Sequence, residues 1–318
     1  MKIVVLDGFT LNPGDLSWNA LQCLGDVTVH SRTAPAELLS RSAGATALLT
    51  NKTVIGADDM AQLSQLKYIG VLATGYNVVD IEAARRLGIV VTNIPAYSTH
   101  SVAQMVFSHL LNIVTRVDHY ASEARSKVWS RQADFSYTNT PLIELAGKKI
   151  GLVGFGHTGQ ATAQIALGFG MDVRVFTSKP QSLLPQGVTK ALDIDELFST
   201  CDVVSLHCPL TSDTLHLVDA RRLSLMHPHA ILINTGRGPL VNEDHLAAAL
   251  QRRQIMAAGL DVMASEPPVE DHPLLQLSNC FITPHIAWAS YEARVRLMQL
   301  AVDNLKSFIE GNVINNVI

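Results

Sequence analysis

Residues 150–170 read IGLVGFGHTGQATAQIALGFG. An apolar run comes first, glycines follow at 154, 156 and 159, and apolar residues then recur at helical spacing. This is the G-x-G-x-x-G pattern of a strand, a tight turn and a helix that together bind a dinucleotide. Gly154 permits the turn, Gly156 lets backbone N–H groups approach a pyrophosphate, and Gly159 lets helix and strand pack closely. The helix N-terminus would receive the pyrophosphate, because its unpaired N–H groups and dipole favour anions.

The next predicted strand, 173–176, is followed by Thr177, Ser178 and Lys179. Enzymes that use NAD usually carry Asp or Glu here, and this acid binds the ribose hydroxyls. Two hydroxyls and an ammonium group stand here instead, and they are suited to binding a 2′-phosphate. The sequence therefore favours NADPH over NADH, and use of NADH remains the alternative.

Short β-branched runs alternate with amphipathic segments on both sides of this motif, which predicts parallel sheets covered by helices on both faces. The first series of predicted strands is 3–6, 27–30, 45–50, 68–72 and 89–92, and the second is 149–153, 173–176, 203–207, 230–234, 258–262 and 281–283. The predicted helices include 81–87, capped by Asp80, and 159–169, 194–198, 243–252 and 291–310. The fold class is therefore α/β, with two doubly wound parallel sheets in tandem.

The last predicted helix carries an apolar stripe that must be buried: Val295, Met298, Val302, Leu305 and Ile309. Since it follows the last strand of the second sheet, we expect the chain to return there to the first domain. The predicted domains are 99–287, which binds the dinucleotide, and a discontinuous substrate domain of 1–98 plus 288–318.

Composition excludes several classes of protein. Hydrophobic residues make up 47% of the chain and charged residues 16%, which argues against disorder. A net charge of −4 without basic clusters disfavours nucleic-acid binding. The four cysteines are scattered, so neither disulfides nor a metal site are predicted. No apolar run reaches the length of about 18 residues that would indicate a membrane span, and we expect a cytoplasmic protein.

Polar residues follow three strands of the second series. Asn234-Thr235-Gly236-Arg237-Gly238 ends one strand, Asp261 and Glu266 follow the next, and His285 follows the third. Ligands of open α/β sheets bind outside the carboxyl ends of the strands, so these groups should converge there.

Together, these motifs resemble the D-isomer-specific 2-hydroxyacid dehydrogenase family over nearly the whole chain. Ala73-Thr74-Gly75-Tyr76-Asn77 and His285-Ile286-Ala287-Trp288 are most similar to its glycerate dehydrogenase (hydroxypyruvate reductase) branch. The resemblance implies a Rossmann cofactor domain inserted in a flavodoxin-like substrate domain. It also implies an NAD(P)-dependent oxidoreductase acting on a small 2-keto acid, with hydroxypyruvate reduced to D-glycerate and glyoxylate also accepted.

The resemblance implies three catalytic residues. His285 would give a proton to the carbonyl oxygen, which suits an imidazole because it exchanges protons near neutrality. Glu266 would hydrogen-bond the imidazole and fix its tautomer. Arg237 would hold the substrate carboxylate and keto oxygen through its forked donors.

The resemblance also implies binding residues. Backbone N–H groups of Thr74 and Gly75 would hold the substrate carboxylate, and Trp288 favours a small hydroxylated substrate. Asp261 would accept a hydrogen bond from the nicotinamide carboxamide, with a structural cap as the alternative. The predicted cofactor contacts are Gly154, Gly156, His157, Thr158, Gly159, Thr177, Ser178, Lys179, Thr235 and Asp261.

The segment Ser98–Leu142 resembles the part of the family that forms a homodimer, and its residues Trp129, Phe135 and Tyr137 suit a buried interface. Two other functions remain open. One is a dehydrogenase for another D-2-hydroxy acid, and the other is a dinucleotide-sensing protein similar to the corepressors related to this family. An L-specific dehydrogenase is disfavoured, since its glycine motif would normally begin the chain.

Overall fold

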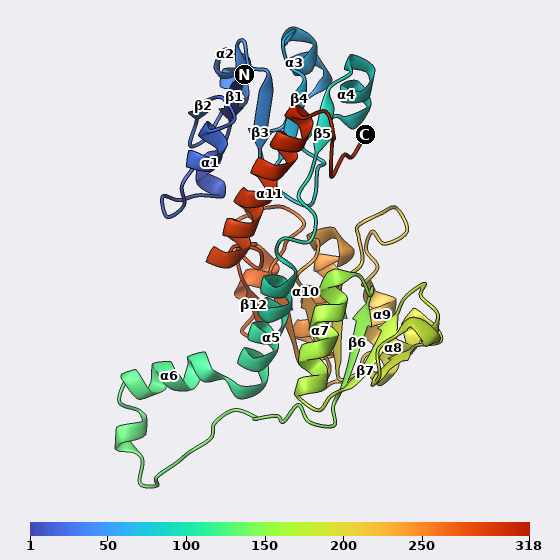
Figure 1. Ribbon diagram of the computed structural model, residues 1–318. Coiled ribbons are helices and arrows are strands. Elements are labelled where there is room, and N and C mark those ends of the chain that lie inside the picture. Colours follow the sequence, from blue (N-terminus) through green and yellow to red (C-terminus); the bar gives the residue numbers. More distant parts are fainter. The chain divides into compact units, whose positions relative to one another are not determined.

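The structure is a computed structural model that describes all residues, 1–318 (Figure 1). The chain divides into two compact units, and each is described by itself. Unit 1 is Met1–Ser98 with Trp288–Ile318, and unit 2 is Thr99–Ala287. No helix combines the length and the apolar character that crossing a membrane requires.

Unit 1 is built on a parallel five-stranded sheet of order β2-β1-β3-β4-β5. Its strands are β1 (Lys2–Val5), β2 (Asp26–Val29), β3 (Ala47–Thr50), β4 (Tyr68–Val71) and β5 (Val90–Thr92). The inner strands β3 and β4 are buried along their whole length, as expected when helices cover both faces. This strand order is the flavodoxin-like arrangement.

The helices of unit 1 are short apart from the last. They are α1 (Asn19–Gln22), α2 (Leu38–Ser42), α3 (Ala57–Gln62), α4 (Ile81–Leu87) and α11 (Tyr291–Ile309). The predicted cap of α4 is confirmed, because the Asp80 carboxylate accepts from Ala83 N at 2.9 Å. Gly88 ends α4 in the left-handed conformation.

Helix α11 belongs to unit 1 and packs on β4, but the predicted stripe is wrong at both ends. Val295 is 42% exposed and Ile309 is 45% exposed. The buried stripe is instead Ala293, Leu297, Ala301 and Leu305, one residue per helical turn. Two of its four members are alanines, whose small side chains let the helix approach the sheet closely.

Unit 2 is built on a parallel seven-stranded sheet of order β8-β7-β6-β9-β10-β11-β12. Its strands are β6 (Lys149–Val153), β7 (Asp172–Phe176), β8 (Val188–Lys190), β9 (Val203–Leu206), β10 (Ile231–Asn234), β11 (Ala257–Leu260) and β12 (Cys280–Ile282). The order runs outward from β6 on both sides, as in the Rossmann fold, so the predicted fold class is confirmed. Strand β8 was not predicted.

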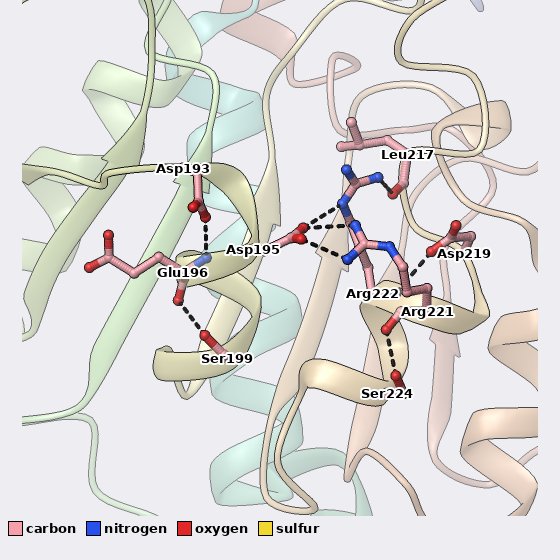
Figure 2. Close-up of polar contacts among 9 residues, drawn as sticks. All are labelled: Asp193, Asp195, Glu196, Ser199, Leu217, Asp219, Arg221, Arg222 and Ser224. Atoms are coloured by element: carbon pink, nitrogen blue, oxygen red, sulfur yellow. Dashed lines mark hydrogen bonds and ion pairs between the residues drawn. The ribbon is translucent and has the colours of Figure 1, made fainter.

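The helices of unit 2 are α5 (Thr99–Thr115), α6 (Val117–Arg125), α7 (His157–Gly168), α8 (Ile194–Thr200), α9 (Ala220–Leu225) and α10 (Glu243–Gln251). Helix α5 packs against α7 and against β10 and β11. Between α8 and α9, the Asp195 carboxylate binds the guanidinium groups of Arg221, at 2.6 and 2.9 Å, and Arg222, at 3.1 Å (Figure 2). The bond from Arg221 is the main reason that the pKa of Asp195 is lowered.

Helix α6 and the irregular chain that follows it extend away from the sheet of unit 2 (Figure 1). No residue of α6 is buried, and the Phe135 side chain is 91% exposed. The segment is held together internally, because Tyr137 donates to the Glu123 carboxylate at 2.7 Å and Trp129 Nε1 donates to the Phe135 carbonyl at 3.0 Å. Its shape is therefore defined even though the side chains of Trp129 and Phe135 are exposed.

Candidate active site

The glycine motif joins β6 to α7 as predicted, and each glycine has its own geometric reason. Gly154 has a φ of +101°, and a Cβ there would lie 2.7 Å from the His207 carbonyl group. A Cβ on Gly159 would lie 2.5 Å from the Gly154 carbonyl oxygen. A Cβ on Gly156 would meet no atom within 4 Å, so this backbone borders open space. Gly154 and Gly159 therefore permit packing, and Gly156 leaves room for a ligand beside the N-terminus of α7.

A cavity of about 350 Å³ lies against this motif, entirely within unit 2. Its lining includes Gly154, Phe155, Gly156, Thr177, Ser178 and Lys179. The predicted phosphate-reading residues thus border the same cavity as the glycines. The Lys179 ammonium forms no ion pair and lies 5.6 Å from the centre of the Phe155 ring. A helix N-terminus, open backbone and an unpaired ammonium fit the phosphates of a dinucleotide.

The cavity lies at the point where the strand order reverses, between β6 and β9. His207, which directly follows β9, was not assigned from the sequence. Its Nε2 lies 2.9 Å from Ser205 Oγ, and burial lowers the pKa of His207 to about 4. The imidazole is therefore neutral near pH 7 and neither attracts nor repels a phosphate by charge. Nothing in the sequence around it marks this burial in advance.

The side chains of Glu266 and His285 meet as predicted. Glu266 Oε2 and His285 Nδ1 are 2.6 Å apart, and Glu266 Oε1 accepts from Met263 N at 3.1 Å. An ionised carboxylate only accepts, so Nδ1 is the donor of this bond. His285 Nε2 has no partner in the structure and is left for a ligand. The backbone of His285 is left-handed, with a φ of +52°.

Asp261 lies beneath this histidine and is 1% exposed. Its Oδ1 accepts from Thr283 Oγ1 at 2.6 Å and from Ile286 N at 3.0 Å. Its Oδ2 accepts from Ala287 N at 2.8 Å. Asp261 therefore caps the turn that carries His285, which is the structural alternative considered above. Its contact with a nicotinamide carboxamide stays a prediction.

Arg237 lies at the end of β10, exposed and in no ion pair, with Nη1 donating to the Gly236 carbonyl at 2.8 Å. The Asn234 side chain clamps the turn, since Nδ2 donates to Arg237 O at 2.8 Å and Oδ1 accepts from Gly236 N at 3.1 Å. A Cβ on Gly238 would lie only 2.0 Å from the Met263 carbonyl carbon. The turn of Arg237 thus packs directly on the backbone that leads to Glu266.

Thr235, another predicted cofactor contact, has a buried Oγ1 without any hydrogen-bond partner. Burying an unsatisfied hydroxyl costs free energy, so this atom is suited to a bond with a bound molecule. Because β10, β11 and β12 are parallel neighbours, their carboxyl ends bring Thr235, Arg237, Asp261 and His285 to one edge of the sheet.

The remaining predicted residues, Thr74, Gly75 and Trp288, belong to unit 1. The loop of Thr74 is fixed by two bonds, from Thr74 Oγ1 to Ile94 O at 2.9 Å and from Asn93 Nδ2 to Thr74 O at 2.7 Å. The Trp288 ring packs edge-on against Tyr97, with centroids 6.4 Å apart.

Sequence reasoning missed a buried carboxylate in unit 1. Asp7 accepts from the backbone N–H groups of Asn51, Lys52 and Thr53 at 2.8, 2.6 and 2.9 Å. Asn51 Nδ2 in turn donates to the Leu72 carbonyl at 2.6 Å. Asp7 and Asn51 thereby connect the loops that follow β1, β3 and β4. An aspartate directly after a buried strand was the available signal.

Comparison with known proteins identifies a family of similar proteins. Residues 107–287 match the family model described as the NAD binding domain of D-isomer specific 2-hydroxyacid dehydrogenases. The chain is 43% identical over 320 residues to a hydroxypyruvate reductase of Blautia hydrogenotrophica, covering 100% of this chain and 99% of that protein. It is 38% identical over 290 residues to a glycerate dehydrogenase of Methylorubrum extorquens, covering 91% and 90%.

Solved structures are similar over the whole chain. A protein of Thermus thermophilus has a TM-score of 0.89 and 39% identity, with 100% of both chains covered. An NADPH-dependent glyoxylate/hydroxypyruvate reductase of Sinorhizobium meliloti, in complex with NADP and malonate, has a TM-score of 0.84 and 30% identity, with 99% and 96% covered.

Proposed function

The chain belongs to the D-isomer specific 2-hydroxyacid dehydrogenase family, and from this premise we propose that it reduces hydroxypyruvate to D-glycerate, with glyoxylate as a second substrate. It is an oxidoreductase that links a nicotinamide cofactor to small 2-keto acids. The observation that carries the proposal is the contact of 2.6 Å between His285 Nδ1 and Glu266, which leaves Nε2 available to a substrate. Relatives named for hydroxypyruvate and glyoxylate support the choice of substrates.

The proposed chemistry uses three side chains of unit 2. A reduced nicotinamide, when bound, supplies the hydride that reaches C2 of the keto acid. His285 Nε2 donates a proton to the carbonyl oxygen, which completes the hydroxyl group of the product. Glu266 accepts from Nδ1 and stabilises the imidazolium before the transfer. The exposed, unpaired guanidinium of Arg237 holds the substrate carboxylate and the negative charge that develops on the keto oxygen.

The same proposal gives roles to the residues around the cavity of unit 2. Gly156 and the N-terminus of α7 hold the pyrophosphate, and Thr235 Oγ1 donates its free hydrogen to the cofactor. Thr177, Ser178 and Lys179 hold a 2′-phosphate, so NADPH is preferred over NADH. The Thr74–Gly75 backbone and Trp288 contact the substrate from unit 1.

Replacing Thr177 by aspartate is expected to reverse the cofactor preference. The new carboxylate repels the 2′-phosphate and offers an acceptor to the ribose hydroxyls of NADH. A charge-assisted hydrogen bond contributes about 1.5–3 kcal/mol, so kcat/KM for NADPH should fall roughly tenfold to a hundredfold. Steady-state kinetics with both cofactors measure this. Thr177→Asn introduces a side chain with the shape of aspartate but without its charge. It should change the preference between NADPH and NADH far less. A wild-type enzyme that prefers NADH tenfold would contradict the assignment.

The proposed function is tested by following the absorbance of the reduced nicotinamide. NADH and NADPH are each combined with hydroxypyruvate, glyoxylate and pyruvate, and the product is analysed for D-glycerate on a chiral column. The highest kcat/KM is expected for NADPH with hydroxypyruvate. Failure of all six combinations would contradict the proposal and favour a dinucleotide-sensing protein.

We further propose that two copies of the chain associate through the segment Ser98–Leu142. The exposed aromatic rings of Trp129 and Phe135, on a segment that extends from the sheet, support this. A molar mass of two chains in light scattering is the expected result, and a monomer at micromolar concentration would contradict it.

A further inference from the structure

His109 is a buried histidine that none of the steps above uses. It lies on α5, is 5% exposed, and its Nε2 is 3.1 Å from Thr283 Oγ1. Thr283 Oγ1 is in turn 2.6 Å from Asp261 Oδ1. A chain of two hydrogen bonds therefore connects the middle of α5 to the carboxylate beneath His285.

The direction of these bonds follows from the groups themselves. The Asp261 carboxylate only accepts, so the single hydroxyl hydrogen of Thr283 is donated to it. The oxygen of Thr283 must then accept from His109, which places the proton of the His109 ring on Nε2. Burial lowers the pKa of His109, against the opposing charge of Asp261, so the ring is neutral near pH 7.

Strand β11 has a glycine where the His109 ring packs against it. Gly259 lies under His109, and a Cβ there would lie 2.7 Å from His109 Cβ and 2.9 Å from its Cγ. Any larger residue at 259 would push α5 away from the sheet. The absence of a side chain at Gly259 thus lets the imidazole approach closely enough to reach Thr283.

The other end of the chain of bonds is the turn that carries His285. Asp261 accepts from the N–H groups of Ile286 and Ala287, and His285 just before them has a φ of +52°. A bulky residue keeps this left-handed conformation only where its surroundings determine it. Asp261 provides that constraint, and it stays in place because Thr283 and the two backbone N–H groups hold its oxygens.

We propose that His109 is a positioning residue for the reaction: through Thr283 and Asp261, it fixes the turn that sets the His285 ring against Glu266. This inference rests on the proposed function, since it takes His285 as the proton donor. His109 itself transfers no proton and contacts no substrate. Its contribution is to keep Asp261 Oδ1 in place, so that His285 remains in its left-handed conformation.

The test compares two substitutions at the same position. His109→Leu keeps the volume of the ring and removes the Nε2 donor, whereas His109→Gln places an amide N–H close to where Nε2 stands. Losing one buried hydrogen bond in this network should lower kcat about tenfold in His109→Leu, with KM for the keto acid and for NADPH nearly unchanged. His109→Gln should recover kcat to within about threefold of wild type. Equal losses in both variants, or a loss confined to KM, would overturn the proposal.

Two further measurements separate positioning from a general loss of stability. The NMR resonance of the His285 Nδ1 proton, which reports the hydrogen bond to Glu266, should move upfield in His109→Leu, because this contact is loosened. Thr283→Val removes the intermediate hydroxyl, so adding His109→Leu to it should cause no further loss of kcat. If His109→Leu lowers the melting temperature but leaves the resonance of the His285 Nδ1 proton unchanged, or if its effect on kcat adds fully to that of Thr283→Val, the inference is wrong.

The variant His285→Ala separates this inference from the proposed function. If His285→Ala is inactive while His109→Leu keeps the kcat and the His285 Nδ1 proton resonance of wild type, only the positioning role fails. If His285→Ala is as active as wild type, the proposed proton donor is wrong and the positioning role falls with it.

Discussion

Replacing His285 by alanine should lower kcat for hydroxypyruvate by at least about 10²-fold, because general acid catalysis by a positioned side chain contributes roughly 10²–10⁴-fold. The lost imidazole is the group whose Nε2 is unpartnered and whose Nδ1 contacts Glu266 at 2.6 Å. Binding of NADPH, followed by its fluorescence, should be nearly unchanged, since the glycine motif and Thr177 lie on other elements of unit 2.

The matched control is His229→Ala, which removes an exposed imidazole from the loop before β10. It should leave kcat and cofactor binding as in wild type. If His285→Ala retained more than about a third of the wild-type kcat, His285 would not be the acid.

Replacing Arg237 by alanine should have the second-largest effect, a fall in kcat/KM of about 10²–10³-fold, the size found when a donor to a developing oxyanion is removed. KM for the keto acid should rise because the carboxylate loses its partner, and kcat should fall because the charge on the keto oxygen is no longer stabilised. The guanidinium forms no ion pair within the protein, so its removal leaves no buried carboxylate behind.

Arg237→Lys keeps the charge but not the planar fork of donors, so it should recover only part of the lost kcat/KM. Thermal unfolding of both variants should match wild type, since the side chain is exposed. Arg237→Ala could instead lower the melting temperature while the folded enzyme keeps the kcat/KM of wild type. That result would show that Arg237 has only a structural role.

The arrangement of the strands could be predicted because buried parallel strands are continuous apolar runs, and the boundaries of β6 agree with the prediction. The convergence of Glu266 and His285 at one edge of the sheet was also predictable, since both follow parallel strands, and their direct contact was implied by the family resemblance. Strand β8 was missed because it has only three residues and follows a proline and a glycine, at 185 and 187. The buried face of α11 was misplaced because Ala293 and Ala301 carry little hydrophobic signal, although both are buried in the core of unit 1.

Contacts between distant segments could not be predicted. His109 and Thr283 are separated by 174 positions in the sequence. Their contact depends on how closely α5 approaches the sheet at Gly259. Neither residue belongs to a motif that would pair them. In the same way, Asp7 was not singled out, because its three N–H donors lie more than 40 positions further along the chain.

The missing side chain at Gly238 has a practical consequence for anyone who wishes to change the substrate preference by directed evolution. A methyl group there would overlap the backbone at Met263, so random codons at position 238 would mostly encode proteins in which the Glu266 loop is displaced. In a screen, the inactivity of these proteins would mask beneficial substitutions at neighbouring positions. A library that keeps position 238 as glycine, and varies the residues at 74 and 288 of unit 1, would concentrate its diversity on positions that are proposed to contact the substrate.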